Sequence, residues 1–321
     1  MSGEEGTTPQ PPPLKRRGGA ERSLEAPSSS EEGVGGGVAP IARAIREAAA
    51  RLAATSDTAR LDAEVLMAHA LGISRSDLLL RRMADPEPKG FAALVERRAG
   101  HAPVAHIVGS QDFFGLTFRV TPDVLIPRGD SEVLVEAALA ARSDARRVLD
   151  CGTGSGALLL AVLANLPAAT GLGIDRSAPA LAVARGNADA LGLAQRAEMR
   201  AGDWLTPGWA DGLGRFDLVL ANPPYVEEGA VLAASVRSHE PAEALFAGPD
   251  GLADYRVLVP QLPALLAPGG VALVEIGHEQ ADAVMALAVG AGMEAALHRD
   301  LGGRARVLEL KIPLGKVPAS A

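Results

Sequence analysis

Seven residues link a predicted strand to a predicted helix and define the architecture: Asp150-Cys151-Gly152-Thr153-Gly154-Ser155-Gly156. The apolar run that leads into them predicts a short strand over Arg147–Asp150, and the run that follows predicts a helix over Ala157–Asn165. Three glycines let the backbone turn tightly and let a ligand approach main-chain N–H groups at the start of the helix. The segment therefore predicts a ligand-binding loop at the carboxyl end of a buried strand.

Strand and helix patterns alternate beyond this loop. Further strands are predicted over Gly171–Asp175, Ala197–Ala201, Phe216–Ala221, Val271–Ile276, Glu294–His298 and Arg306–Lys311. Further helices are predicted over Ala178–Leu191, Val257–Leu266 and Glu279–Val289. Such alternation favours an α/β fold in which a mainly parallel sheet carries helices on both faces. Ligands of such sheets bind at the carboxyl ends of the strands, near the point where the strand order reverses.

Asp175 ends the second predicted strand. A carboxylate at this place can accept hydrogen bonds from both hydroxyls of a ribose, which favours a cofactor that contains adenosine. Two such cofactors remain open at this point. The pattern Gly152-x-Gly154-x-x-Ala157 fits the dinucleotide fingerprint, whereas Asp150 followed by glycines at 152, 154 and 156 is typical of proteins that bind S-adenosylmethionine.

An indole follows the third predicted strand, in Gly202-Asp203-Trp204. Trp204 can form a wall beside an adenine ring, with Asp203 near the amino edge of that ring. A core or lid position is the alternative for an isolated tryptophan. Because Asp150 and Asp175 also indicate a cofactor site, we favour a position for Trp204 beside the adenine.

The fourth predicted strand leads directly into Asn222-Pro223-Pro224-Tyr225. Two prolines end the strand and fix a rigid turn at the carboxyl edge of the sheet. The side-chain carbonyl of Asn222 and a backbone carbonyl of the turn can together accept both hydrogens of a planar –NH2 group. Tyr225 offers a wall and a hydroxyl. The motif therefore predicts a site for an amide or aromatic amino group.

Methyl transfer to such a nitrogen places modest demands on the protein. An amide nitrogen is a poor nucleophile because its lone pair is delocalised, but a sulfonium methyl group is already strongly electrophilic. We therefore expect the site mainly to align nitrogen, methyl carbon and sulfur. Acceptors on both N–H bonds also stabilise the positive charge that develops on nitrogen. The proton can leave to water, so the chemistry requires neither a histidine base nor a metal ion.

The sequence predicts five parts, of which three lie before the loop and the fourth contains it. Residues 1–38 are rich in Gly, Glu, Pro and Ser and predict a disordered tail. Residues 39–102 carry apolar positions at helical spacing and predict a small helical domain. The remaining predicted parts are a β-hairpin linker at 103–128, a catalytic domain at 129–314 and a flexible C-terminus at 315–321. Within the linker, strands are predicted at Val104–Val108 and Phe113–Val120.

Composition excludes several classes of protein. Of the 321 residues, 48% are hydrophobic and 22% are charged, which suits a globular protein and not a collagen or a coiled coil. The net charge of −8 argues against non-specific binding of nucleic acid. A single cysteine, Cys151, permits no intramolecular disulfide and favours a reducing compartment. Because no run of 18 apolar residues occurs, no membrane span is expected.

Taken together, the motifs resemble the HemK/PrmC family of protein-(glutamine-N5) methyltransferases over about residues 40–312. Residues 120–128 resemble the linker signature of the family. The family places its cofactor and substrate contacts at positions that correspond here to the glycine loop, Asp175, Trp204 and Asn222–Tyr225. Further matches are Glu240-Pro241, Asp250-Gly251-Leu252, Pro268-Gly269-Gly270, Glu275-Ile276-Gly277 and Asp300-Leu301-Gly302-Gly303-Arg304. The linker departs from the pattern at Gly129, where Pro is usual, and at His106, where Tyr is common.

The resemblance implies a Rossmann-like class I S-adenosylmethionine-dependent methyltransferase with a seven-stranded sheet. It implies that the substrates are peptide chain release factors, methylated on the glutamine of their Gly-Gly-Gln motif, and that the helical domain helps to recognise them. The implied cofactor residues are Gly152, Thr153, Gly154, Ser155, Gly156, Asp175, Trp204 and Asn222. The implied substrate residues are Asn222, Pro223, Pro224 and Tyr225, with catalytic roles for Asn222, Pro223 and Tyr225. A cytoplasmic monomer without a nucleic-acid or membrane partner is expected.

Other functions compete with this one. A sister enzyme methylates a glutamine of a ribosomal protein, but Asp130-Ser131-Glu132 favours the release-factor branch. Adenine-N6 DNA methyltransferases use a related Asn/Asp-Pro-Pro-Tyr motif. This chain is acidic, however, and residues 39–100 contain no evident basic segment that could recognise DNA. A non-enzymatic S-adenosylmethionine-binding protein, or a nicotinamide oxidoreductase, would leave residues 222–225 unexplained.

Overall fold

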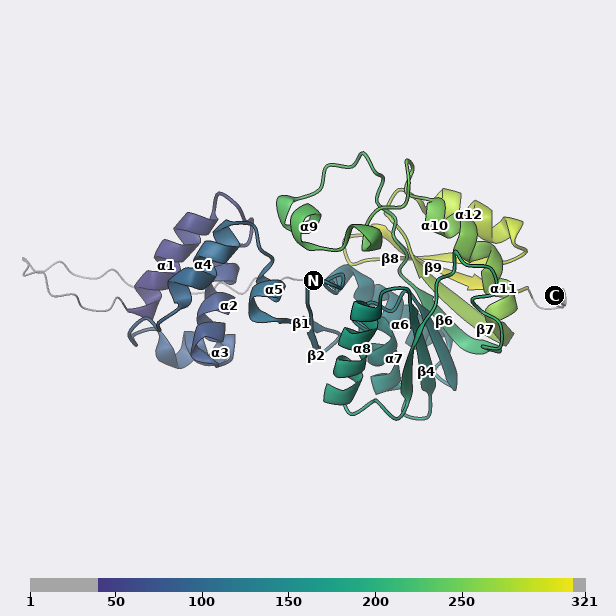
Figure 1. Cartoon of the computed structure of the whole chain (residues 1–321), viewed down its shortest axis with the longest axis horizontal. Helices are drawn as coiled ribbons and strands as arrows, with labels where there is room; N and C mark the ends of the chain where they lie inside the picture. The colour runs from purple at the N-terminus through teal and green to yellow at the C-terminus, as the bar shows by residue number, and fades with distance from the viewer. Residues whose placement is uncertain (1–39, 314–321) are drawn as a thin grey trace, which may run out of the picture. The chain divides into compact units, whose positions relative to one another are not determined.

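The computed structural model describes residues 40–313 (Figure 1). The predicted disordered tail, residues 1–38, and the predicted flexible C-terminus, residues 315–321, lie outside the described residues. No helix in the described part is long and apolar enough to cross a membrane.

The first described region is helical, as predicted. Its elements are α1 (Ile41–Leu52), α2 (Ala59–Leu71), α3 (Arg75–Asp77), a π-helical turn η1 (Leu78–Arg82) and α4 (Phe91–Ala99). They enclose an apolar cluster of their own, in which Ile45, Leu52 and Leu66 are fully buried. Gly72 ends α2 in the left-handed conformation, with φ of 65°, which costs glycine no steric strain.

The linker differs in part from the prediction. Residues Val104–Val108 form a short helix, α5, and not a strand. The three β-branched residues at 104, 107 and 108 suggested a strand, but the tertiary environment decided otherwise. Ile107 packs into the helical cluster, while Ala105 packs with Val120 and Val124 of the linker. Gly109, with φ of 79°, ends the helix.

A β-hairpin is present as predicted, but its turn falls within Phe113–Val120, which was predicted as one strand. It consists of β1 (Ser110–Phe113) and β2 (Leu116–Arg119), which are antiparallel. Phe114 and Gly115 form the two-residue turn, with φ of 49° and 73°. Positive φ at both central positions matches the right-handed twist of the two strands.

The central sheet confirms all seven predicted strands. They are β3 (Arg147–Cys151), β4 (Thr170–Asp175), β5 (Ala197–Ala201), β6 (Phe216–Ala221), β7 (Leu266–Glu275), β8 (Glu294–Arg299) and β9 (Ala305–Lys311). Their order is β5-β4-β3-β6-β7-β9-β8. All pairs are parallel except β7 with β9 and β8 with β9. The order reverses between β3 and β6, so the glycine loop and Asn222 follow two adjacent strands.

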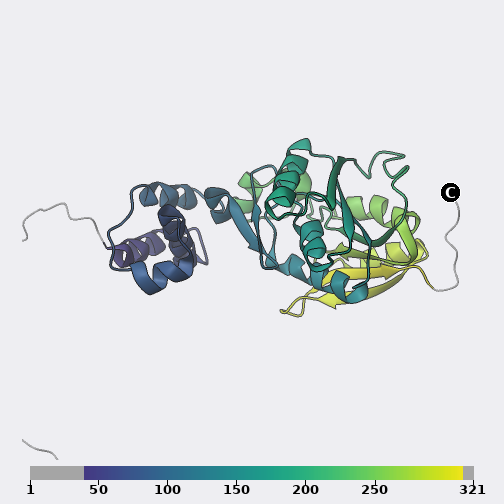
Figure 2. The same ribbon diagram turned by 90° about the horizontal axis from the view of Figure 1, so that it is seen from below.

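Helices cover both faces of the sheet (Figures 1 and 2). One apolar cluster joins α6 (Glu132–Ala141), α7 (Ala157–Asn165) and α8 (Ala178–Ala190) to strand residues such as Val148 and Leu218. A second cluster joins α10 (Ala253–Leu258), α11 (Leu262–Leu265) and α12 (Ala281–Gly290) to Leu149 and Val219. Successive residues of one strand thus face opposite layers, as the two-residue period of a strand requires. Helix α6 had no prediction of its own.

The segment between β6 and β7 also differs from the prediction. The helix expected over Val257–Leu266 is divided into the end of α10, a 3-10 turn η4 (Val259–Gln261) and α11. Pro260 and Pro263 each lie in the first turn of a piece, where the missing N–H leaves no hydrogen bond unmade. Strand β7 then begins at Leu266, before the Pro-Gly-Gly turn that was expected to precede it. The remaining short elements are η2 (Gly129–Ser131), α9 (Ala234–His239) and η3 (Ala242–Ala244).

Candidate functional site

The glycine loop lies at the carboxyl end of β3 and is held mainly by its own main chain. The N–H groups of Gly152 and Thr153 both donate to the carbonyl of Ile174, at 2.8 and 2.9 Å. The N–H of Gly154 donates to the Asp175 carboxylate at 2.8 Å. Within residues 40–313, the N–H of Ser155 forms no hydrogen bond, so it remains available to a ligand. The loop is therefore a preformed turn with one main-chain donor to spare.

The three glycines of the loop serve two different purposes. All have positive φ, between 53° and 82°. A Cβ atom at Gly152 would stand 3.0 Å from the indole of Trp204, so glycine lets the ring lie against the loop. A Cβ atom at Gly156 would press on Leu160 and on Ala184, at 3.0 and 3.3 Å. Gly156 does not line the pocket and instead permits close packing of α7 against α8.

A buried carboxyl group lies under the loop. Asp150 is fully buried and accepts a hydrogen bond from the Thr153 hydroxyl at 2.7 Å, while its Oδ1 atom has no partner within residues 40–313. Burial raises the pKa of Asp150 to about 7. Burial also raises the pKa of the neighbouring Cys151 thiol, which suits a small structural residue and not a reactive thiolate.

Asp175 lies at the end of β4, as predicted, and it lines the pocket. Its two oxygens accept main-chain hydrogen bonds from Ser177 and Gly154, each at 2.8 Å. Burial raises the pKa of this carboxyl, and the two N–H groups partly oppose that shift. Each oxygen keeps acceptor capacity for one further donor, which is what a pair of ribose hydroxyls requires.

Trp204 is both a packing residue and a pocket residue. Its indole N–H donates to Asp254 at 3.0 Å, and its ring packs against the second apolar cluster. The other part of the ring lies beside Gly152 and lines the pocket, together with Asp203. The indole is therefore fixed in orientation by Asp254 before any ligand binds.

The Asn-Pro-Pro-Tyr turn begins where β6 ends. Asn222 and Pro224 line the pocket, whereas Pro223 and Tyr225 do not. Within residues 40–313, the side-chain amide of Asn222 forms no hydrogen bond, and its atoms are not among the buried unpartnered ones. The Tyr225 hydroxyl points to Glu275, at 3.4 Å, and burial raises the pKa of Tyr225 to about 12.

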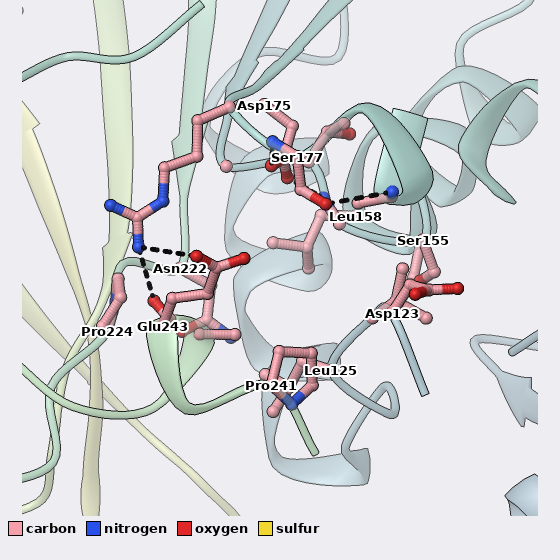
Figure 3. Close-up of a pocket in the computed structure, with 18 of the residues that line it drawn as sticks. Asp123, Leu125, Ser155, Leu158, Asp175, Ser177, Asn222, Pro224, Pro241 and Glu243 are labelled. Atoms are coloured by element: carbon pink, nitrogen blue, oxygen red, sulfur yellow. Dashed lines mark hydrogen bonds and ion pairs between the residues drawn. The ribbon is translucent and has the colours of Figure 1, made fainter. Parts of the chain in front are cut away.

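The opposite side of the pocket was not predicted. It is formed by linker residues, among them Asp123 and Leu125, and by the segment after α9, with Pro241 (Figure 3). Ser131 of η2 also lines it. Arg128 pairs with the buried Glu240, which also accepts the main-chain N–H of Ile126 at 3.2 Å.

A second ion pair joins Arg176, which follows β4, to the Glu243 carboxylate at 3.8 Å. Arg176 also donates to the main-chain carbonyl of Glu243 at 3.1 Å. The sequence signal for this wall was weak: Glu240-Pro241 was noted only as part of the family pattern, and nothing local connects it to the glycine loop more than 80 residues earlier.

The charge of the pocket bears on the choice of cofactor. Its lining includes four carboxylates, of Asp123, Asp175, Asp203 and Glu243, and two arginines, Arg128 and Arg176. Both arginines are already paired with glutamates. An acidic lining of this kind, with Asp150 beneath the loop, opposes a pyrophosphate and suits a cationic sulfonium. The residues present therefore fit S-adenosylmethionine. No group of three or more His, Cys, Asp or Glu in the described part is arranged to hold a metal ion.

Comparison with known proteins narrows the class. A family model for the PrmC N-terminal domain matches residues 43–109, and a model for a methyltransferase domain matches residues 142–287. The release factor glutamine methyltransferase of Caulobacter vibrioides is 44% identical over 269 residues, covering 80% of this chain and 91% of that protein. The protein of the same name from Cereibacter sphaeroides is 45% identical over 280 residues, covering 85% and 98%. That from Moorella thermoacetica is 44% identical, covering 83% and 96%.

Fold and pocket thus define a class I S-adenosylmethionine-dependent methyltransferase. Within that class, the chain belongs to the release factor glutamine methyltransferase family.

Proposed function

We propose that this protein transfers a methyl group from S-adenosylmethionine to the side-chain amide nitrogen, N5, of the glutamine in the Gly-Gly-Gln motif of peptide chain release factors. One observation carries the proposal. Asn222 lines the pocket directly after β6, the strand that pairs with β3 before the glycine loop, and its side-chain amide forms no hydrogen bond within the described residues. The names of the relatives supply the substrate.

The loop and its surroundings would hold the cofactor. The N–H of Ser155 and the main chain of residues 152–154 face its sugar and amino-acid parts, Asp175 accepts the ribose hydroxyls, and Trp204 flanks the adenine. Thr153 fixes the loop through Asp150, and Gly156 acts indirectly, through helix packing. When bound, S-adenosylmethionine supplies an electrophilic methyl group on a sulfonium.

The substrate amide would be oriented by the turn. The Asn222 side-chain carbonyl accepts one N–H of the glutamine amide, and the main-chain carbonyl of Pro223 accepts the other. Two acceptors stabilise positive charge as it develops on nitrogen. Pro224 limits the motion of the turn, and Tyr225, outside the pocket lining, fixes the end of the turn through its hydroxyl. The proton is released to water, so no side-chain base takes part.

Two finer points belong to the same proposal. We expect the protein to act as a monomer in the cytoplasm, on a protein substrate and without nucleic acid or membrane. A ribosomal-protein glutamine, or an adenine in DNA, is the competing acceptor, because each presents the same conjugated –NH2 group to Asn222.

Transfer of a labelled methyl group tests the proposal directly. Purified protein should label a release factor, and a release factor with Gln→Ala in its Gly-Gly-Gln motif should stay unlabelled. Ribosomal protein and DNA are assayed in parallel. Equal labelling of the two release factors would refute the assignment of the target glutamine.

Asn222→Ala should lower kcat at least 100-fold, since loss of one well-placed hydrogen-bond partner of the transition state has effects of this order. Its affinity for cofactor, measured by calorimetry, should change much less. Asn165→Ala is the matched control, because Asn165 lies at the exposed end of α7 and bonds only to Ala161. Substantial turnover by Asn222→Ala would contradict the assigned role.

A further inference from the structure

Glu275 is a buried carboxylate that the proposed reaction does not use. It is the last residue of β7, next to the strand that carries Asn222, and only 1% of it is exposed. Its Oε1 atom accepts the Tyr225 hydroxyl at 3.4 Å, and its Oε2 atom has no partner within residues 40–313. Burying a carboxylate with an unsatisfied oxygen is costly. A leucine would fill the same space without that cost, so the carboxylate calls for a reason.

The surroundings of Glu275 connect it to two sides of the site. The Ser131 hydroxyl, which lines the pocket, and the Arg306 guanidinium both favour its ionised form. Arg306 itself binds Asp130 and Asp300, at 2.9 and 3.1 Å. Burial nonetheless dominates and raises the pKa of Glu275 to about 7.

The main chain of Tyr225 is held independently. Gln280 donates its side-chain amide to the Tyr225 carbonyl at 3.0 Å and to the Gly251 carbonyl at 3.2 Å, and it accepts the Gly277 N–H at 3.0 Å. Glycine at 251 is needed for this approach, because a Cβ atom there would overlap the Tyr225 carbonyl oxygen. With its backbone fixed in this way, Tyr225 retains mainly the rotation of its side chain.

We propose that Glu275 is a positioning residue, whose carboxylate holds the Tyr225 side chain in one orientation at the end of the Asn222–Tyr225 turn. It does not line the pocket, and its link to the Asn222–Tyr225 turn is the Tyr225 hydroxyl. The effect on turnover rests on the proposed function, whereas the effect on Tyr225 does not.

Spectroscopy tests the contact without any substrate. The chain has only two tyrosines, so labelling tyrosine with carbon-13 at Cζ gives two resonances, which Tyr255→Phe assigns. Glu275→Gln should move the Tyr225 resonance more than that of Tyr255, because the Tyr255 hydroxyl donates to the main-chain carbonyl of Glu275, at 2.9 Å, and not to its carboxylate. In the unsubstituted protein the Tyr225 resonance should also titrate near pH 7, and Glu275→Gln should abolish that titration. Glu309→Gln is the control, since Glu309 is a largely buried carboxylate on β9 that contacts His298 and Lys311 instead.

Kinetics tests the consequence of that contact. Glu275→Gln should lower kcat roughly 10- to 100-fold, the range expected for loss of a charge-assisted hydrogen bond, with cofactor affinity unchanged. In a Tyr225→Phe background, Glu275→Gln should cause no further loss, because the two residues act as one unit.

The outcomes separate the two proposals. A Tyr225 resonance that ignores Glu275→Gln, or a shift shared equally with Tyr255, overturns the positioning role. Multiplicative losses in the double variant overturn it as well, because Glu275 would then act through another group. If the spectroscopic result holds but the unsubstituted protein methylates no release factor, the proposed function fails while the contact stands.

Discussion

At the scale of single residues, the site depends on groups whose hydrogen bonds are only partly used. Each carboxylate oxygen of Asp175 accepts one main-chain hydrogen bond and can accept another from a ligand. The side-chain amide of Asn222 forms no hydrogen bond within the described part of the chain. Asp254, by contrast, is consumed in fixing the Trp204 indole. Spare acceptor capacity, and not residue type alone, distinguishes the groups that would bind from those that support them.

Asp175→Ala should weaken cofactor binding by roughly 10- to 1000-fold, because one or two hydrogen bonds to a charged acceptor are lost. The substitution also frees the N–H groups of Gly154 and Ser177. Calorimetric titration with S-adenosylhomocysteine measures the change. Asp211→Ala is a suitable control, since Asp211 does not line the pocket. An unchanged Kd for Asp175→Ala would remove this residue from the cofactor site.

At the scale of elements, the close approach of α8 to the start of α7 depends on glycine at position 156. Gly156 begins α7 at φ of 82° and leaves no room for a Cβ atom beside Leu160 and Ala184. Gly186, inside α8, has ordinary helical φ and open space around it. The same chemical change, glycine to alanine, should therefore have opposite effects at the two positions.

Gly156→Ala should destabilise the protein by about 1–3 kcal/mol, because it strains the backbone and crowds α8. Gly186→Ala should stabilise it by about 0.5–1 kcal/mol, since alanine has the higher helix propensity. Urea unfolding measures both free energies. Two changes of the same sign would show that the contact between α7 and α8 is looser than described.

At the scale of the whole molecule, two buried carboxyl groups at the carboxyl edge of the sheet govern stability against pH. The pKa values of Asp150 and Glu275 are raised to about 7 in the folded protein, whereas ordinary values near 4 apply when the chain is unfolded. The unfolded chain therefore releases these protons at lower pH. Their contribution to stability is complete below about pH 4 and is lost as pH rises through 7.

The thermal midpoint should accordingly fall between pH 5.5 and pH 8, by several degrees, since each group contributes on the order of 3 kcal/mol. The combined variant Asp150→Asn, Glu275→Gln should flatten this slope. Below pH 5, carboxylates with lowered pKa values, such as Glu64 and Asp300, lose their partners and oppose the trend. Calorimetric scans at constant ionic strength supply the measurement, and a midpoint that rises toward pH 8 would contradict the assigned shifts.

Much of the fold and of the candidate site was predictable, because strand and helix patterns alternate along residues 147–311. The seven strands followed from short apolar runs, and the glycine loop, Asp175 and Asn222 followed from their places at strand ends. Parallel strands bring their carboxyl ends to one edge, so residues 150, 175 and 222 had to meet. The domain boundaries and the roles of the site residues stay predictions.

The sequence alone thus determined the order of elements, the edge of the sheet that carries the site and the family to which the chain belongs. Tertiary structure alone decided that residues 104–108 form a helix and that Gly156 serves packing. It also decided that Glu240 forms an ion pair with Arg128 and that Glu275 accepts a hydrogen bond from Tyr225. The reason is one of range. Period and turn chemistry act over a few residues, whereas burial and the pairing of buried charges join residues 50 to more than 100 positions apart.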